Sequence, residues 1–157
     1  MRRLRIQQRT KKPVLTVRRG VGETKNLVYV AVANKMIPYP IGKSPIVYIG
    51  TTSRGLLRIL ESAGARSESV LSQHGITKIH FFVLTCTARQ KLKSWKILER
   101  ALIGRFRELR GAIPCENAKL KKSADRSWAQ FFEEKQLDKV LGSYRPARSR
   151  KRKKSSK

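Results

Sequence analysis

The sequence predicts a small α+β domain, with a three-stranded antiparallel sheet flanked by helices in the order β-β-α-β-α and one more helix at the C-terminal end. Two short β-prone runs, residues 27–32 and 46–49, follow each other with no helical pattern between them. A third apolar run, 78–84, lies between two segments with helical spacing of apolar residues. Strands that are joined directly pair as an antiparallel hairpin, and this indicates an antiparallel sheet.

The first two strands are predicted to be separated by a long loop. The stretch 33–45 holds three prolines and a glycine, which interrupt regular structure and indicate an enlarged connection between the strands. A helix follows the second strand, because residues 51–53 are all Thr or Ser and each can cap a helix that runs to about residue 63. Gly64 is a plausible end for this helix, and residues 65–76 are predicted to be a loop. One helix face would hold Leu56, Leu57 and Leu60.

The longest helix is predicted over residues 89–110, followed by Gly111 and Pro114, which end it. Residues 127–141 are predicted to form an amphipathic helix that packs either on the sheet or on a partner protein. Its aromatic residues fit core packing, with base stacking as the alternative. The apolar positions of the long helix are Leu98, Leu102, Phe106 and Leu109, and the aromatic residues of the last helix are Trp128, Phe131 and Phe132.

The chain carries 37 Lys and Arg against 10 Asp and Glu, a formal net charge of +27. A chain this basic is expected to bind polyanions, nucleic acid above all. The charge also suggests the organisation of the chain. We expect a basic extension over 1–23, a folded domain over 24–122, an amphipathic helix over 123–142 that packs on the domain, and a disordered basic tail over 143–157.

Several classes of protein are not expected. The longest apolar stretch, around residues 79–88, is about half of what a bilayer span requires, so no membrane association is predicted. The N-terminal residues carry charge instead of an apolar core, which argues against a secretory signal. The two cysteines have no metal-ligand spacing, and an intracellular, reducing compartment is expected: the cytoplasm or nucleoid, or the nucleus in a eukaryote.

Four polar residues within otherwise apolar elements form a recognisable pattern. Tyr29 lies in the first strand and Tyr48 in the second, where it opens the tripeptide Tyr-Ile-Gly. Arg58 follows Tyr48 by ten residues and falls on the first helix, and Glu99 falls on the long helix. Taken singly, each has an ordinary structural explanation. The long helix then continues through Leu102, Phe106, Gly111 and Pro114 to Asn117.

Over about residues 24–120 this pattern resembles the GIY-YIG nuclease superfamily. The resemblance implies a metal-dependent endonuclease that hydrolyses phosphodiester bonds in DNA. Its catalytic residues would be two tyrosines that flank the attacking water, an arginine on the phosphate, a carboxylate that holds one Mg²⁺ or Mn²⁺ ion, and an amide that orients the network. In this chain those residues are Tyr29, Tyr48, Arg58, Glu99 and Asn117, with Glu99 as the metal ligand. Which tyrosine acts as the base stays open.

The chain departs from the family pattern in three ways. The first tripeptide is Leu-Val-Tyr and lacks both the Gly and the Ile, and nineteen residues separate the two tyrosines, more than is usual. Many members also place a His shortly after the arginine, where this chain has Glu61-Ser62-Ala63. His74 or His80 could take over its role in proton transfer.

Basic residues outside this set are predicted to hold the nucleic acid by its phosphates, which gives affinity without sequence specificity. DNA is the expected partner, and RNA stays open. One alternative is a non-catalytic DNA- or RNA-binding protein on the same scaffold, and another is an adaptor that uses residues 127–141. The predicted nucleic-acid-binding residues are Lys91, Lys93, Lys96, Arg100, Arg105, Lys119, Lys121 and Lys122.

Overall fold

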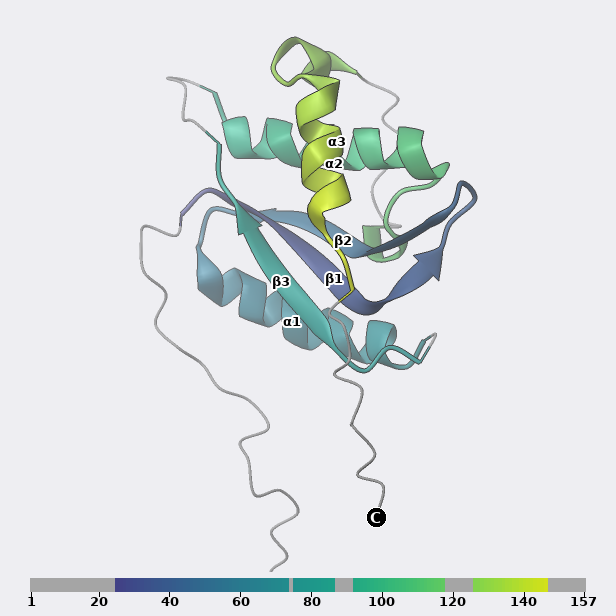
Figure 1. The fold of residues 1–157 in the computed structure, drawn as a ribbon. Helices are drawn as coiled ribbons and strands as arrows, with labels where there is room; N and C mark the ends of the chain where they lie inside the picture. The colour runs from purple at the N-terminus through teal and green to yellow at the C-terminus, as the bar shows by residue number, and fades with distance from the viewer. Residues whose placement is uncertain (1–24, 74, 87–91, 118–125, 147–157) are drawn as a thin grey trace, which may run out of the picture.

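The computed structural model describes residues 25–73, 75–86, 92–117 and 126–146, and within them it confirms the predicted α+β fold (Figure 1). The sheet is antiparallel and has the strand order β2-β1-β3. Two 3₁₀ turns, Cys115–Asn117 and Ser127–Gln130, accompany the longer elements. The strands are β1 (Leu27–Pro38), β2 (Lys43–Thr52) and β3 (Ile79–Leu84), and the helices are α1 (Leu56–Leu71), α2 (Ser94–Arg110) and α3 (Glu134–Ser143).

The predicted long loop between the first two strands is wrong. β1 and β2 pair from Leu27 opposite Thr52 to Pro38 opposite Lys43, so the hairpin extends through most of the stretch 33–45. The prolines are compatible with this, because Pro38 ends its strand and Pro45 lies in β2, an edge strand whose outer backbone groups need no strand partner. The hairpin register shifts between Ala31 and Val32.

β1 is the central strand, and its residues 27–33 are buried on both faces. Its residues Val28 and Val30 belong to the apolar cluster that includes α2 and α3, whereas Tyr29 and Ala31 pack on the side of α1. Figure 1 shows the same layers, with α1 on one side of the sheet and α2 and α3 on the other. Alternate residues of one strand therefore reach two different environments, as side chains of a strand must.

Helix α1 is longer than predicted. It continues through Gly64 to Leu71, so the predicted stop and the first half of the predicted loop 65–76 are both wrong. A glycine inside a helix is tolerated at a cost of about 1 kcal/mol, and a Cβ at Gly64 would meet nothing within 4 Å. The helix buries Ile59 and Val70, while Leu57 and Leu60 are exposed, so the predicted apolar face is also wrong. The N-cap residue is Gly55 and not one of residues 51–53.

Helices α2 and α3 cover the other face of the sheet. α2 begins at Ser94 instead of 89 and ends, as predicted, at Gly111, which adopts a left-handed φ of 72°. The predicted helix 127–141 divides into a 3₁₀ turn and α3. It packs on its own domain, where Trp128, Leu137 and Leu141 are all buried in the core, and this supports packing over base stacking for Trp128.

The packed part of the chain extends past the predicted boundary at residue 142. Helix α3 ends at Ser143, and the ring of Tyr144 lies 5.1 Å from that of Phe82 on β3. The predicted extension 1–23 and the predicted tail beyond Pro146 lie outside the described residues. Among the described helices, none has the length and apolar content needed to cross a membrane.

Candidate active site

The two tyrosines of the predicted site lie side by side on the α1 side of the sheet. The ring centroids of Tyr29 and Tyr48 are 5.7 Å apart, with the rings tilted by 46°. Gly50 is opposite Tyr29 in the strand register. A Cβ at Gly50 would lie 2.7 Å from Tyr48 Oη and 2.9 Å from Tyr29 Cζ, closer than real contacts allow. The glycine of Tyr-Ile-Gly therefore leaves the space that the two phenol rings occupy.

The two phenols have different surroundings. Tyr29 is 1% exposed, and its hydroxyl shares a 2.8 Å hydrogen bond with the Ser62 hydroxyl on α1. Tyr48 is only partly buried, and burial raises its pKa to about 12, with further upward contributions from Tyr29 and Glu99. Tyr48 is therefore the phenol with more access to solvent, and it is protonated at neutral pH.

Arg58 lies on α1 near both phenols. Its side chain is 48% exposed and forms a 2.9 Å ion pair with Glu61, which also pairs with Arg54 at 3.0 Å. The hydrogen bond to Glu61 raises the pKa of the Arg58 guanidinium, and Tyr29 and Tyr48 raise it further. The ion pair with Glu61 therefore fixes the position of the half-exposed Arg58 guanidinium.

Two residues of the stretch Glu61-Ser62-Ala63, where many family members have a His, contact predicted site residues. Glu61 holds Arg58, and Ser62 holds Tyr29. Neither arrangement supplies an imidazole. His80 does not supply one either, because it pairs with Val32 in register and so belongs to the α2 and α3 face of the sheet, opposite to the tyrosines. His74 lies outside the described residues.

Arg66 is a site residue that sequence reasoning missed. Its guanidinium carbon lies 3.8 Å from the ring centroid of Tyr48. The same side chain donates to the Glu116 carbonyl at 2.9 Å and lies 4.0 Å from the Glu116 carboxylate. It was missed because the helix was predicted to end at Gly64, which placed Arg66 in a loop. A continuous helix would have placed Arg66 two turns beyond Arg58, on the same side of α1.

Glu99 approaches from the opposite side of the sheet, on α2. It is partly buried, and the Thr51 hydroxyl donates to its Oε2 at 3.3 Å. Burial raises the pKa of the Glu99 carboxyl, and the hydrogen bond from Thr51 opposes this. Because Thr51 follows Gly50 on β2, this contact brings the carboxylate to the end of the strand that carries Tyr48. Arg58 and the two tyrosines belong to the α1 side of the sheet, whereas Glu99 belongs to the α2 side and contributes to the raised pKa of Tyr48 (Figure 1).

Asn117 has a backbone role. Its Oδ1 accepts from the Ile49 N–H at 2.9 Å, and its Nδ2 donates to the Ile49 carbonyl at 2.7 Å. The side chain is buried, so it holds β2 in place instead of facing solvent. Its role in the predicted site is therefore indirect: it holds the backbone of Ile49, which lies between Tyr48 and Gly50.

The residues present fit a single hard cation held by one carboxylate. Within the described part of the chain, no group of three or more His, Cys, Asp or Glu side chains could enclose a metal ion. Mg²⁺ keeps most of its water and commonly binds proteins through one or two carboxylates together with substrate phosphates. Glu99, with Thr51 beside it, meets that requirement, whereas a caged metal site is not formed by these residues.

The predicted nucleic-acid-binding residues separate into three groups. Lys93, Lys96 and Arg100 are exposed at the start of α2, on the helix that carries Glu99. Arg105 is different, because it is 16% exposed and pairs with Glu108, Glu134 and Asp138 at 2.9, 2.9 and 2.7 Å. These ion pairs join α2 to α3 and give Arg105 a structural role in place of the expected phosphate contact. Outside the described residues lie Lys91, Lys119, Lys121 and Lys122.

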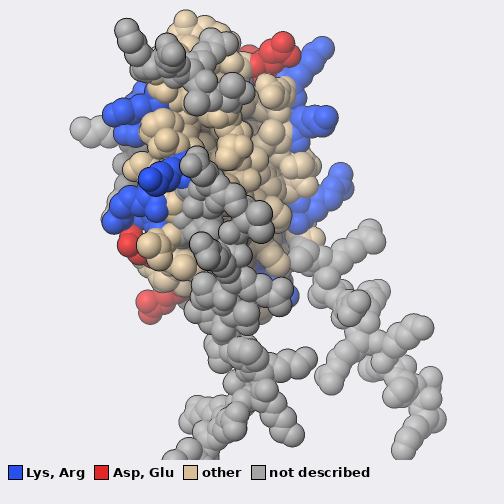
Figure 2. Space-filling view, turned by 90° about the vertical axis from the view of Figure 1, so that its left-hand side faces the viewer, with Lys and Arg blue, Asp and Glu red and all other residues tan. Residues whose placement is uncertain are grey.

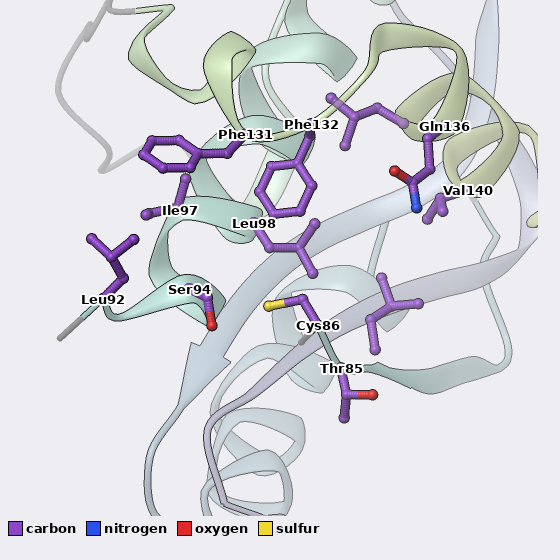
Figure 3. Close-up of a pocket in the computed structure, with 12 residues that line it drawn as sticks. Thr85, Cys86, Leu92, Ser94, Ile97, Leu98, Phe131, Phe132, Gln136 and Val140 are labelled. Carbon is purple, nitrogen blue, oxygen red and sulfur yellow. The ribbon is translucent and has the colours of Figure 1, made fainter. Parts of the chain in front are cut away.

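One face of the molecule is seen in Figure 2, where Lys and Arg side chains line both sides and few Asp or Glu are visible. A separate pocket of ≈ 490 Å³ lies between the end of β3, the start of α2 and α3 (Figure 3). Mostly apolar side chains surround it, among them Leu98, Cys86 and Phe132. None of the predicted catalytic residues lines this pocket.

Comparison with known proteins identifies no relative: no family model, no curated protein and no solved structure matches the chain. The fold class is established by the strand order and the helices, and the family resemblance of the motif remains a hypothesis.

Proposed function

We propose that this protein is a metal-dependent endonuclease of the GIY-YIG type, which hydrolyses phosphodiester bonds in DNA. The observation that carries the proposal is the arrangement around Tyr48. The centroid of the Tyr29 ring lies 5.7 Å from that of Tyr48, and the Arg66 guanidinium carbon lies 3.8 Å from the Tyr48 ring centroid. A partly exposed tyrosine beside a second phenol and a guanidinium is suited to handle a water molecule beside a phosphate.

Phosphodiester hydrolysis needs an activated water and neutralisation of the charge that develops on the phosphate. Tyr48, the more accessible phenol, would orient and deprotonate the water, and the buried Tyr29 would position it. Arg58 keeps donor groups beyond the one that Glu61 uses, and these suit a phosphate oxygen. Glu99 would hold one Mg²⁺ or Mn²⁺ ion. When bound, such an ion neutralises phosphate charge and acidifies its water.

The basic residues of α2 would hold the DNA near this site. Lys96 and Arg100 share a helix with Glu99 and Lys93 directly precedes that helix, so a strand bound along them would approach the carboxylate. Phosphate contacts of this kind release counterions, and binding should weaken steeply as salt rises. DNA as the substrate would place the protein in the cytoplasm or nucleoid, or in the nucleus of a eukaryote.

A plasmid-nicking assay tests the proposal. Supercoiled plasmid is incubated with wild-type protein and Mg²⁺ or Mn²⁺, with chelator, and with Glu99→Gln. We expect nicking that requires the metal and falls by about a hundredfold or more in the variant, because the metal ligand is lost. Glu68→Gln is the matched control, since Glu68 is an exposed carboxylate of α1. Nicking that persists in chelator or in Glu99→Gln contradicts the proposal.

A second candidate function is non-catalytic binding of DNA or RNA. The observation that favours it is Tyr29, which is buried and bonded to Ser62, in a site that lacks the family His. Salt-sensitive binding of DNA or RNA with no nicking under either metal would select this function over the nuclease. Titrations with both nucleic acids would then separate a DNA-binding from an RNA-binding protein.

A further inference from the structure

We infer that Arg66 is a positioning residue, which fixes the ring of Tyr48 and sets a permanent positive charge against its face so that the phenol can act on water. This role rests on the proposed function. Its basis is the stacking of the guanidinium on the ring, with the guanidinium carbon 3.8 Å from the ring centroid. A guanidinium over an aromatic face is attracted by the ring and restricts how the ring can turn.

The position of Arg66 is set by contacts on its other side. The Glu116 carbonyl accepts from its Nη1 at 2.9 Å, and the Glu116 carboxylate lies 4.0 Å away. Ser69, one turn further along α1, donates to that carboxylate at 3.0 Å. Glu116 directly precedes Asn117, which binds the backbone of Ile49. The turn Cys115–Asn117 therefore holds the arginine and the strand of Tyr48 together.

The chemistry needs a nearby cation. Tyr48 must first release its proton to solvent, and its phenolate oxygen then takes a proton from the attacking water. The resulting hydroxide forms the new bond to phosphorus, and the bond to the leaving oxygen breaks with its electron pair on that oxygen, which a solvent proton neutralises. A fixed positive charge stabilises the phenolate more than the phenol. Arg66 needs no proton transfer of its own, because a guanidinium keeps its charge throughout.

Tyr29 from β1 and Arg66 from α1 contact the ring of Tyr48, whereas Arg58 on α1 and Glu99 on the other side of the sheet act on Tyr48 only through their charge. Burial, Tyr29 and Glu99 raise the pKa of Tyr48, and Arg66 lowers it. Arg58 pairs closely with Glu61, which offsets much of its charge. Among the residues that the structure describes, Arg66 is thus the cation that stacks on the ring.

The experiment follows Tyr48 itself as well as nicking. The protein is labelled at tyrosine Cζ, and its alkaline titration is recorded by NMR in the absence of metal, with Tyr48→Phe identifying the signal. We expect Arg66→Met to move the Tyr48 titration upward, so that less phenolate forms than in wild type at the highest pH at which both proteins stay folded. Arg66→Lys keeps the charge and should show a smaller change. Arg107→Met removes an exposed arginine of α2 and should leave the midpoint in place.

The nicking rate is measured across pH for the same variants. At any pH below the midpoint, a rise of the midpoint by about one pH unit leaves about tenfold less phenolate, so Arg66→Met should lower kcat about tenfold with little change in KM. An unchanged Tyr48 midpoint overturns the inference whether or not the protein is a nuclease. A moved midpoint with an unchanged pH profile of nicking also overturns it. Absence of nicking by wild-type protein overturns the proposed function, and the titration still shows whether Arg66 acts on Tyr48.

Discussion

Asn117 holds the edge strand β2 through two hydrogen bonds to a single residue, Ile49, with distances of 2.9 Å to its N–H and 2.7 Å to its carbonyl. β2 pairs with β1 on one side only, so the backbone groups on its other side have no strand partner. The amide of Asn117 takes the place of that missing partner. Because Ile49 lies between Tyr48 and Gly50, these two hydrogen bonds fix the position of the backbone of the whole Tyr-Ile-Gly segment.

Asn117→Ala should therefore destabilise the domain. The substitution leaves a buried N–H and a buried carbonyl without partners, and we expect the free energy of unfolding to fall by about 2–3 kcal/mol, measured by denaturant unfolding. Asn34→Ala is the control. Asn34 also makes side-chain bonds, to Thr77 and Lys78, but in an exposed setting where water replaces them. A comparable loss in both variants would show that burial of the Asn117 bonds is not the cause.

Gly50→Ala should damage the site more than the fold. The new Cβ would lie 2.7 Å from Tyr48 Oη and 2.9 Å from Tyr29 Cζ, so both rings must move. We expect a loss of about 1–3 kcal/mol of stability and a larger proportional loss of nicking. Gly64→Ala is the matched control, because a Cβ there meets nothing within 4 Å. That variant should gain up to about 1 kcal/mol in thermal or denaturant unfolding and keep wild-type nicking.

The difference in stability between wild type and Glu99→Gln should depend on pH. Burial raises the pKa of Glu99 above its ordinary value of 4.5, so the folded state favours the neutral carboxyl. Wild-type stability therefore declines as pH rises from that value through the raised pKa, whereas Gln has no charge to bury. We expect the variant to unfold at a higher temperature than wild type at neutral pH, with the difference vanishing below pH 4.5.

Mg²⁺ provides the second half of this test. If Glu99 binds the ion, added Mg²⁺ should raise the melting temperature of the wild-type protein and leave that of Glu99→Gln unchanged. Equal responses to Mg²⁺ would mean that the ion binds elsewhere. The isosteric amide still accepts from Thr51, so loss of that hydrogen bond does not confuse the comparison.

Arg105→Met should weaken the contact between α2 and α3 and leave nucleic-acid binding nearly intact. The substitution removes a bidentate pair with Asp138 and two further ion pairs, and we expect a loss of about 1–2 kcal/mol at neutral pH. The Arg105 guanidinium lowers the pKa of Asp138, so the stability that this pair contributes is lost as pH falls through that lowered pKa.

Arg100→Met is the comparison for binding, since Arg100 is exposed on the same helix. It should reduce DNA affinity and the slope of affinity against salt, with little change in stability. The opposite outcome, in which Arg105→Met weakens DNA binding more than Arg100→Met does, would restore Arg105 to the nucleic-acid surface.

Local patterns predicted the strands well where burial on two faces made them apolar. β1 is central and packs between α1 and α2, so its start is a continuous apolar run that can hardly be missed. The same patterns were misleading where one residue type permits two structures. Gly64 is compatible with a helix end and with an open, solvent-facing helix position, and only the packing of Val70 shows that α1 continues.

The candidate site was predicted in part for the same reason. Tyr48 and Gly50 are two residues apart in the sequence, and their spacing to Arg58 follows from a strand and a helix joined by a short turn. Contacts that depend on packing between distant elements could not be predicted. Arg66 reaches Tyr48 because α1 lies across the sheet, and Glu99 reaches Thr51 from the other layer.

By itself the sequence determined the order of the elements, the excess of positive charge and the residue types available for chemistry, because propensity, periodicity and composition are local properties. Only the tertiary structure decided which of those side chains are partnered inside the protein. Arg105 forms ion pairs with three carboxylates, and Asn117 forms hydrogen bonds with the backbone of Ile49. The side chain of Arg58, in contrast, remains about half exposed. Such partners are far apart along the chain, and packing of the layers is what brings them within hydrogen-bonding distance.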